Sequence, residues 1–262
     1  MDVLTPRTLD EALRLKAERP DAVPIQGGTD VMVELNFDRG RPGALLNLNE
    51  VKELRGWSRR NGTLWLGAGL TYAEAMQPPL LELLPALAEA ARTVGGPQIR
   101  NRGTIGGNLG TASPAGDAIP PLLVSGTEVE LVSERGARSI PLHEFLLGPK
   151  RNDLADDELI YGVTVDTGTP DGRQTFLKVG PRNAMVIAVV SLALSVDQEL
   201  RAAFGSAGPV PTLVRAPLDD VDSFPDRVVG AASPIDDVRG TAAYRSHALR
   251  VLTKRALERC LA

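Results

Sequence analysis

The chain has 262 residues, long enough for one large domain or for two to three small ones with buried cores. Its 43% apolar and 24% charged residues are ordinary for a globular protein, and 4% aromatic residues give no stacking surface for single-stranded nucleic acid. With 29 basic against 33 acidic residues, a net charge of −4 and no basic cluster, nucleic acid and anionic membranes are disfavoured as main partners.

The content of metal-binding side chains is low. The single cysteine, Cys260, excludes an internal disulfide and any cysteine-ligated cluster built by this chain alone, and only His143 and His247 accompany it. We therefore expect no metal site. The N-terminus lacks the pattern of a signal peptide, and the longest apolar run, Met185–Val196, is too short to span a bilayer. These features predict a soluble, cytoplasmic protein.

Residues 1–54 are predicted to form a small α/β unit. A capping box at Thr8–Glu11 opens a helix that ends near Pro20, and the strands Ala22–Gln26 and Ala44–Leu48 follow.

The first of these strands leads directly into Gly27-Gly28-Thr29-Asp30 and a short helical segment, Val31–Asn36. Strand, double glycine, hydroxyl and helix is an order that aims backbone amides at an anion. A plain tight turn between strand and helix is the alternative reading of the same residues.

Residues 55–165 are predicted to form a second unit. Its expected elements are a hairpin over Gly56–Gly67 with Asn61-Gly62 at its turn, a second capping box at Thr71–Glu74, a long helix over Leu80–Val94, a second hairpin over Glu128–Pro141 and a strand over Asp157–Val165.

A second glycine-rich stretch, Gly103–Asp117, lies between the long helix and the second hairpin. Glycines let backbone amides come close to a ligand, and successive exposed amides form a concave nest for an anion such as a phosphate. A tight multiple turn is again the alternative. Asp117 can contact a ligand or can act as the N-cap of a helix starting at Ala118.

The chain changes character from about Asp166. Strands are predicted at Thr175–Val179 and Met185–Val196, and Gly205–Val238 is expected to be an irregular connection. A C-terminal helix over Thr241–Ala262 has an apolar stripe of Tyr244, Ala248, Val251, Leu252 and Ala256.

Two glycine-rich anion loops about 75 residues apart can hold a dinucleotide pyrophosphate between them. Gly27-Gly28-Thr29 does not have the Rossmann spacing, and no G-K-[ST] motif is present, so a P-loop nucleotide hydrolase is excluded.

The sequence resembles the FAD-binding (medium) subunits of the molybdenum hydroxylases, such as the flavin subunits of xanthine dehydrogenases and aerobic carbon monoxide dehydrogenases. Pro24–Asp30 is similar to their first flavin motif and Thr104–Asn108 to their second. Similarity extends over the flanking stretches Thr93–Gly103 and Thr111–Asp117, and over Phe176–Arg182, Asp236–Gly240 and Tyr244-Arg245.

The resemblance implies an α+β fold: a two-lobed FAD-binding fold of the vanillyl-alcohol-oxidase (PCMH) type, followed by a small C-terminal α+β domain. We expect the first lobe at residues 1–54, the second at 55–165, and the C-terminal domain, of the carbon monoxide dehydrogenase flavoprotein type, at 166–262. We expect this last domain to be trimmed at Val196–Ser206 and Val214–Ser233, where relatives carry a longer hairpin and an extra helix.

The resemblance also implies cofactor contacts, with backbone amides of Ile25–Val31 and Thr104–Asn108 around the pyrophosphate, Asp117 on a ribose or ribityl hydroxyl, and Lys178 beside the isoalloxazine. Leu159 and Ile160 would pack on the adenine or the flavin, although both are also plausible core residues, and Lys178 could be a solvated strand lysine. The expected cofactor-binding residues are Ile25, Gln26, Gly27, Gly28, Thr29, Asp30, Val31, Thr104, Ile105, Gly106, Gly107, Asn108, Thr111, Ser113, Asp117, Leu159, Ile160 and Lys178.

The implied function is electron transfer through non-covalent FAD, with no catalytic residues of the chain's own. Substrate oxidation would occur at a molybdenum cofactor on a large subunit, and electrons would reach FAD through [2Fe–2S] clusters on a small subunit and leave to NAD or another acceptor. A dimer of heterotrimers is the expected assembly. A free-standing flavin oxidoreductase of the same fold and a non-redox nucleotide-binding scaffold are the alternatives.

Overall fold

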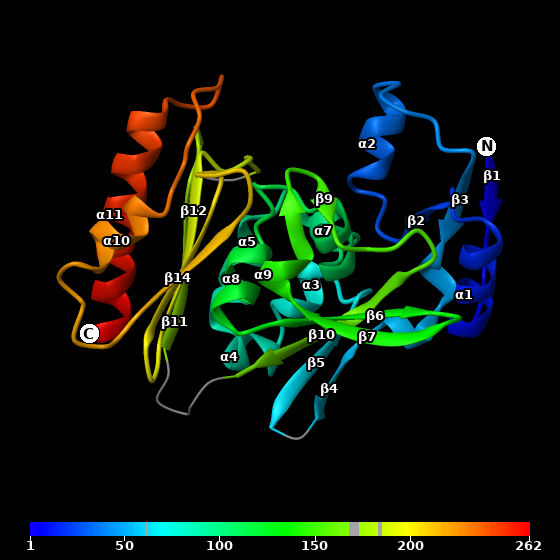
Figure 1. The fold of residues 1–262 in the computed structure, drawn as a ribbon, viewed down its shortest axis with the longest axis horizontal. Coiled ribbons are helices and arrows are strands. Elements are labelled where there is room, and N and C mark those ends of the chain that lie inside the picture. Colours follow the sequence, from blue (N-terminus) through cyan, green and yellow to red (C-terminus); the bar gives the residue numbers. More distant parts are fainter. Residues whose placement is uncertain (61, 168–172, 183–184) are drawn as a thin grey trace.

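The computed structural model describes residues 1–60, 62–167, 173–182 and 185–262. These residues form three successive units, each built on one sheet, and the units lie side by side from the N-terminal to the C-terminal end of the molecule (Figure 1). The α+β fold expected from the sequence is confirmed.

The N-terminal sheet has three short parallel strands in the order β1-β3-β2. Its elements are β1 (Asp2–Leu4), α1 (Leu9–Glu18), β2 (Val23–Ile25), α2 (Val31–Asn36), β3 (Ala44–Asn47) and the 3-10 turns Leu48–Glu50 and Lys52–Leu54. Helix α1 begins as predicted, with Thr8 Oγ1 accepting a hydrogen bond from the Glu11 amide at 3.2 Å. The Glu11 carboxylate, however, accepts from the amide of Arg7 at 2.8 Å, one residue earlier than a capping box requires.

The central sheet has five antiparallel strands in the order β4-β5-β10-β6-β7. These are β4 (Trp57–Arg60), β5 (Thr63–Gly67), β6 (Glu128–Ser133), β7 (Gly136–Pro141) and β10 (Leu159–Asp166), with the ribbon β8 (Leu146–Gly148) and β9 (Arg151–Asn152) beside them. Both predicted hairpins are confirmed as strand pairs; Asn61, predicted at the first turn, lies outside the described residues.

Helices from the middle of the chain cover one side of this sheet (Figure 1). They are α3 (Tyr72–Ala75), α4 (Leu80–Leu83), α5 (Pro85–Thr93), α6 (Pro97–Arg100), α7 (Ile105–Thr111), α8 (Ile119–Val124) and α9 (Leu142–Phe145). The prediction of one helix over Leu80–Val94 is wrong. Because a residue before proline avoids the helical region, Leu84 adopts φ −134° and Pro85 starts a new helix.

Gly103–Asp117 is not the continuous loop expected from its glycines. Residues Ile105–Thr111 form α7, whose N-cap Thr104 accepts a hydrogen bond from the Gly107 amide at 3.0 Å, and the helix ends at Ala112 with φ +46°. Gly106 lies so close to Ala68 of the central unit that an added β-carbon would be 2.6 Å from the Ala68 side chain. Tertiary contact therefore overrides the low helix propensity of three glycines.

The C-terminal sheet has four antiparallel strands in the order β11-β12-β13-β14, and α10 and α11 cover the face opposite to α5 and α8 (Figure 1). The elements are β11 (Arg173–Val179), β12 (Val190–Val196), β13 (Leu200–Gly205), β14 (Thr212–Ala216), α10 (Phe224–Gly230) and α11 (Ala242–Leu261). The expectation that residues 205–238 are irregular is wrong, since β14 and α10 both lie there. Pro225 is compatible with a helix because it occupies the first turn.

Two details of this unit also differ from the sequence prediction. Strand β12 begins at Val190 rather than at Met185, which is exposed. Tyr244 is 49% exposed, so the packed stripe of α11 consists of residues such as Ala248, Leu252 and Ala256 without it. No helix in the described part of the chain combines the length and apolar character needed to cross a membrane.

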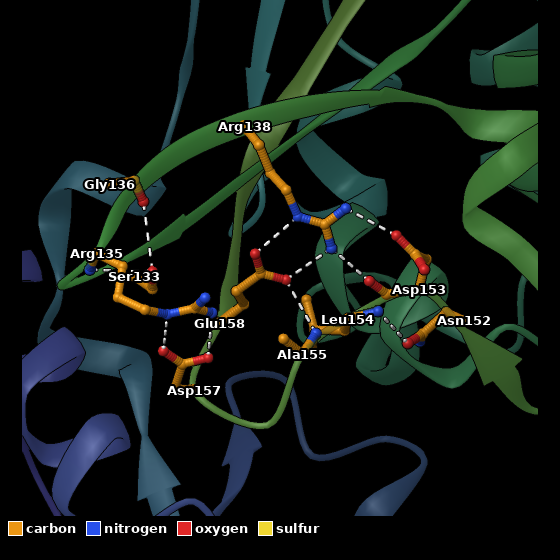
Figure 2. Close-up of polar contacts among 10 residues, drawn as sticks. All are labelled: Ser133, Arg135, Gly136, Arg138, Asn152, Asp153, Leu154, Ala155, Asp157 and Glu158. Atoms are coloured by element: carbon orange, nitrogen blue, oxygen red, sulfur yellow. Dashed lines mark hydrogen bonds and ion pairs between the residues drawn. The ribbon is translucent and has the colours of Figure 1, made fainter.

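Ion pairs from two arginine side chains hold the loop 152–158 against the central sheet (Figure 2). Arg138 on β7 donates to both carboxylate oxygens of Glu158, at 2.7 and 2.8 Å, and to Asp153 Oδ2 at 2.7 Å. Arg135 pairs with both oxygens of Asp157 at 2.7 Å. Because the loop precedes β10, these contacts fix the entry of the strand that joins the two halves of the sheet.

Candidate functional site

The two glycine motifs predicted to act together are in direct contact. A β-carbon on Gly27 would lie 2.0 Å from the carbonyl oxygen of Arg102 and 3.2 Å from the α-carbon of Gly103. The Arg102 side chain also contacts the first unit, with Nη2 donating to the Gln26 carbonyl and to Asn49 Oδ1, each at 3.2 Å. The first unit is thus attached to the start of the second motif at a glycine where no side chain fits.

The first motif presents a run of unused backbone donors. Within the described part of the chain, the amides of residues 27–31 donate no hydrogen bond, and the first amide with an acceptor is that of Met32, at 3.1 Å from the Gly28 carbonyl. Gly28 has φ +73°, which glycine adopts without strain. Consecutive free amides in a glycine turn form an anion-binding concavity.

The second motif uses its amides differently from the expectation. The amides of Ile105 and Gly106 donate to the carbonyls of Leu70 and Ala68 at 2.9 and 2.8 Å, and those of Gly107 and Asn108 donate to Thr104. These amides attach α7 to the central unit. What the motif offers a ligand is the exposed backbone of Gly107 and the side chain of Asn108.

Two buried acceptor oxygens near this helix have no hydrogen-bond donor among the described residues: Oδ1 of Asn108 and Oδ1 of Asp117. The Asn108 amide lies on Gly116, where an added β-carbon would be 3.0 Å from both of its terminal atoms. Because Gly116 directly precedes Asp117, the two acceptors come from neighbouring residues, whose surroundings form the candidate surface. Because a buried acceptor without a donor is unfavourable, this surface is suited to a ligand with hydroxyl groups.

Lys178 lies beside Asp117, with Nζ 2.6 Å from Asp117 Oδ2 and 3.4 Å from both the carbonyl and the hydroxyl oxygen of Thr93. Its side chain is only 5% exposed, so it is not a solvated strand lysine. Burial raises the pKa of Asp117 above its ordinary value, and the ammonium of Lys178 opposes this rise. Burial, with a smaller contribution from Asp117, also raises the pKa of the Tyr72 phenol.

Other predicted residues lie at the margins of this surface. Thr111 Oγ1 donates to Asp30 Oδ2 at 3.1 Å and so joins the two motifs, and Ser113 Oγ accepts from the Ala115 amide at 3.2 Å. Ile160 faces Gly110 on α7, with its Cδ1 atom 3.8 Å from the position of an added β-carbon. Leu159 is 1% exposed and packs in the apolar cluster of the first unit, where it has the position of a core residue.

Sequence reasoning did not find the contacts made by Arg102, Asn49 and Thr93. Arg102 and Thr93 lie inside stretches that resemble the family, but no local pattern marks which acceptor each would meet. Asp117 does not cap α8: the N-cap residue is Ala118, and that helix has no side-chain cap.

Comparison with known proteins places these features in a family. Residues 1–166 match the model of the FAD binding domain in molybdopterin dehydrogenase. A putative xanthine dehydrogenase FAD-binding subunit of Escherichia coli is 30% identical over 97% of this chain and 94% of its own length. A nicotinate dehydrogenase FAD-subunit of Eubacterium barkeri is 35% identical over 75% of this chain and 69% of its own.

A solved structure supports the same fold. A carbon monoxide dehydrogenase from Hydrogenophaga pseudoflava, described as lacking the Mo-pyranopterin moiety of the molybdenum cofactor, superposes with a TM-score of 0.90. The match covers 98% of this chain and 96% of that chain at 24% identity.

The fold and the paired motifs define a flavin-binding subunit. The chain belongs to the family of FAD-binding domains in molybdopterin dehydrogenases, whose members are subunits of oxidoreductase complexes, and FAD is its cofactor. The donor set fits this group, because FAD has a diphosphate for the free amides and sugar and ribityl hydroxyls for the unpaired acceptors.

Proposed function

We propose that the chain is the electron-transferring flavin subunit of a molybdenum-containing dehydrogenase. Substrate would be oxidised at a molybdenum cofactor on a large partner subunit, and the electrons would cross [2Fe–2S] clusters of a small partner subunit. FAD supplies redox chemistry that accepts these electrons and delivers them to NAD or another acceptor. The relatives named as FAD-binding subunits of several dehydrogenases support this assignment.

The observation that carries the proposal is the contact between Gly27 and Arg102 beside a row of free amides. The amides of residues 27–31 would bind the diphosphate, and the contact fixes their distance from α7. Asn108 and Asp117 would accept hydrogen bonds from the cofactor's hydroxyls through their unpaired Oδ1 atoms. The second motif would contribute mainly close backbone approach, because the amides of Ile105–Asn108 already have acceptors.

We propose that the cofactor-binding residues expected from the sequence contact FAD, with Lys178 acting through Asp117. The same lobe boundaries, 1–54, 55–165 and 166–262, are retained as proposals. We further propose a heterotrimer of this chain with a small iron–sulfur subunit and a large molybdenum subunit, dimerised and located in the cytoplasm.

The test is to purify the chain, add FAD, remove excess ligand and record a visible spectrum. Bound flavin should show bands near roughly 375 and 450 nm, as flavoproteins do. Gly230→Ala, at a glycine with nothing within 4 Å of an added β-carbon, is the matched control and should bind equally. A wild-type chain that retains no flavin would overturn the proposal. Isolation from its source with an iron–sulfur and a molybdenum subunit would support the proposed assembly, and isolation as a lone flavoprotein would contradict it.

A further inference from the structure

The ion pair between Lys178 and Asp117 joins two units of the fold. Lys178 is on β11 of the C-terminal sheet, whereas Asp117 lies between α7 and α8 in the central unit. Their side chains are 5% and 11% exposed, and the Nζ–Oδ2 distance is 2.6 Å. A pair this buried and this close is held in one geometry, unlike an ion pair on the surface.

All the donors of the lysine are accounted for. An ammonium group has three N–H donors, and Lys178 Nζ has three acceptors within reach: Asp117 Oδ2 at 2.6 Å, and the carbonyl and Oγ1 of Thr93 at 3.4 Å each. In this arrangement no donor is left for a ligand. The carboxylate, in contrast, has one oxygen in use and one, Oδ1, buried without a donor.

We propose that Lys178 is a positioning residue: it anchors Oδ2 of Asp117 so that Oδ1, ionised and unpaired, accepts a hydrogen bond from a hydroxyl of FAD. This rests on the proposed flavin site. It differs from the role expected from the sequence, in which Lys178 touches the isoalloxazine directly. The binding of cofactor in the central unit then depends on a residue of the C-terminal unit.

The surroundings of the carboxyl determine how pH acts on it. Among the described residues, the ionisable groups that influence it are Lys178 on β11 and Tyr72 on α3, while α5 contributes the neutral Thr93. Burial raises the pKa of Asp117 and Lys178 opposes this. Because Lys178 donates to Oδ2, a proton taken up at low pH goes to Oδ1 and converts the acceptor into a donor. FAD affinity should therefore fall as pH falls.

Removing the lysine should shift this dependence. In Lys178→Met the buried carboxyl loses its cation, its pKa rises further, and the loss of affinity should begin at higher pH. The ratio of dissociation constants between this variant and wild type should be largest, about tenfold or more, at pH values where Asp117 is ionised in wild type but protonated in the variant, and should shrink at higher pH, where Asp117 is ionised in both. A purely structural effect would give the same ratio at every pH.

The experiment is a double-mutant cycle, in which FAD dissociation constants are measured by flavin fluorescence. The pH is varied from about 5.5 to 9, roughly the range in which most proteins stay folded. The variants are Lys178→Met, Asp117→Asn, their combination, and Lys254→Met as a control at an exposed lysine of α11. We expect Asp117→Asn to bind FAD more weakly, without pH dependence, and the added Lys178→Met to change little. Equal losses from Lys178→Met with and without Asp117 would overturn the proposal, because Lys178 would then contact FAD itself.

The measurements distinguish a variant that does not fold, a failure of the positioning role and a failure of the proposed flavin site. Far-UV circular dichroism of each variant shows whether it folds. Where Lys178→Met unfolds, the comparison of wild type with Asp117→Asn decides the question, because equal FAD affinities refute the positioning role. A ratio of the Lys178→Met and wild-type dissociation constants that is the same at every pH, with FAD bound, refutes the positioning role alone. A wild-type chain that binds no FAD at any pH refutes the flavin site, and this inference with it.

Discussion

The α-carbon of Gly27 faces the carbonyl oxygen of Arg102, and a β-carbon at this position would lie 2.0 Å from that oxygen. The two residues are 75 positions apart and belong to different units, yet their backbones define the distance between the two flavin motifs. This contact explains why the first motif needs a glycine that does not have positive φ: the requirement is space, not conformation.

Gly27→Ala should therefore separate the motifs. The added methyl group cannot fit without moving backbone, and overpacking of this kind costs about 1–3 kcal/mol of unfolding free energy. We expect FAD affinity to fall at least about tenfold, since the free amides of the first motif are displaced from the second motif. Urea unfolding and flavin titration measure the two effects. Gly230→Ala should lower neither, and a Gly27→Ala protein with wild-type affinity would contradict the role of the contact.

Asn108→Ala should weaken FAD binding without destabilising the FAD-free chain. Its Oδ1 atom is buried without a donor in the described structure, so its removal should leave the free energy of unfolding of the FAD-free chain unchanged or raise it slightly. Loss of the acceptor should weaken FAD binding about tenfold, equivalent to about 1.4 kcal/mol. Thermal unfolding with and without FAD tests this, with the exposed Gln198→Ala as control. Destabilisation of the FAD-free chain would show that Asn108 is instead a structural residue.

Local chemistry was the part of the structure that the sequence could predict. The Thr71–Glu74 capping box has both of its reciprocal hydrogen bonds, and the hairpins over residues 56–67 and 128–141 form as expected. The two glycine motifs also lie in contact, as their expected pairing requires. Each of these depends on residues that are close in sequence or on a family pattern.

Long-range contacts were the part that it could not predict. The sequence did not predict α7, because its three glycines have low helix propensity. The helix is stabilised by hydrogen bonds to the carbonyls of Ala68 and Leu70 in another segment. Nothing near Lys178 in the sequence indicates that its ammonium would contact Asp117, 61 residues earlier. Short elements such as β14 were missed because five residues carry too little periodicity to distinguish strand from connection.

The Arg138 cluster predicts a pH-dependent contribution to stability (Figure 2). Hydrogen bonds from Arg138, and a smaller one from the Ala155 amide, lower the pKa of Glu158 below its ordinary value of 4.5. A lowered pKa in the folded state stabilises the protein above about pH 4.5, and this contribution is lost as pH falls through the folded-state value.

Arg138→Met should accordingly destabilise the chain at neutral pH by about 1–3 kcal/mol, because the buried Glu158 loses its main donor. The difference from wild type should shrink as pH falls below about 4.5 and Glu158 becomes protonated in both proteins. Urea unfolding from pH 3.5 to 7, a range that spans the ordinary carboxyl pKa values, measures this. Glu258→Gln, at an exposed position of α11, is the control. A difference that stays constant across the range would exclude the ion pair as its cause.

Arg245 on α11 should be the most sensitive position of the C-terminal unit. Its side chain is 2% exposed, and its guanidinium donates to the carbonyls of Val189 and Ser206, at 2.7 and 2.6 Å, and to Asp237. Arg245→Met leaves these acceptors unpaired and should cost about 3–5 kcal/mol of unfolding free energy. Arg245→Lys should recover only part of this loss, because an ammonium group cannot reproduce the several N–H donors of the planar guanidinium. Chemical unfolding followed by circular dichroism provides the measurement, and Arg255→Met, at an exposed arginine of the same helix, is the matched control. Equal stabilities of Arg245→Met and Arg255→Met would show that the buried arginine does not hold α11 on the sheet.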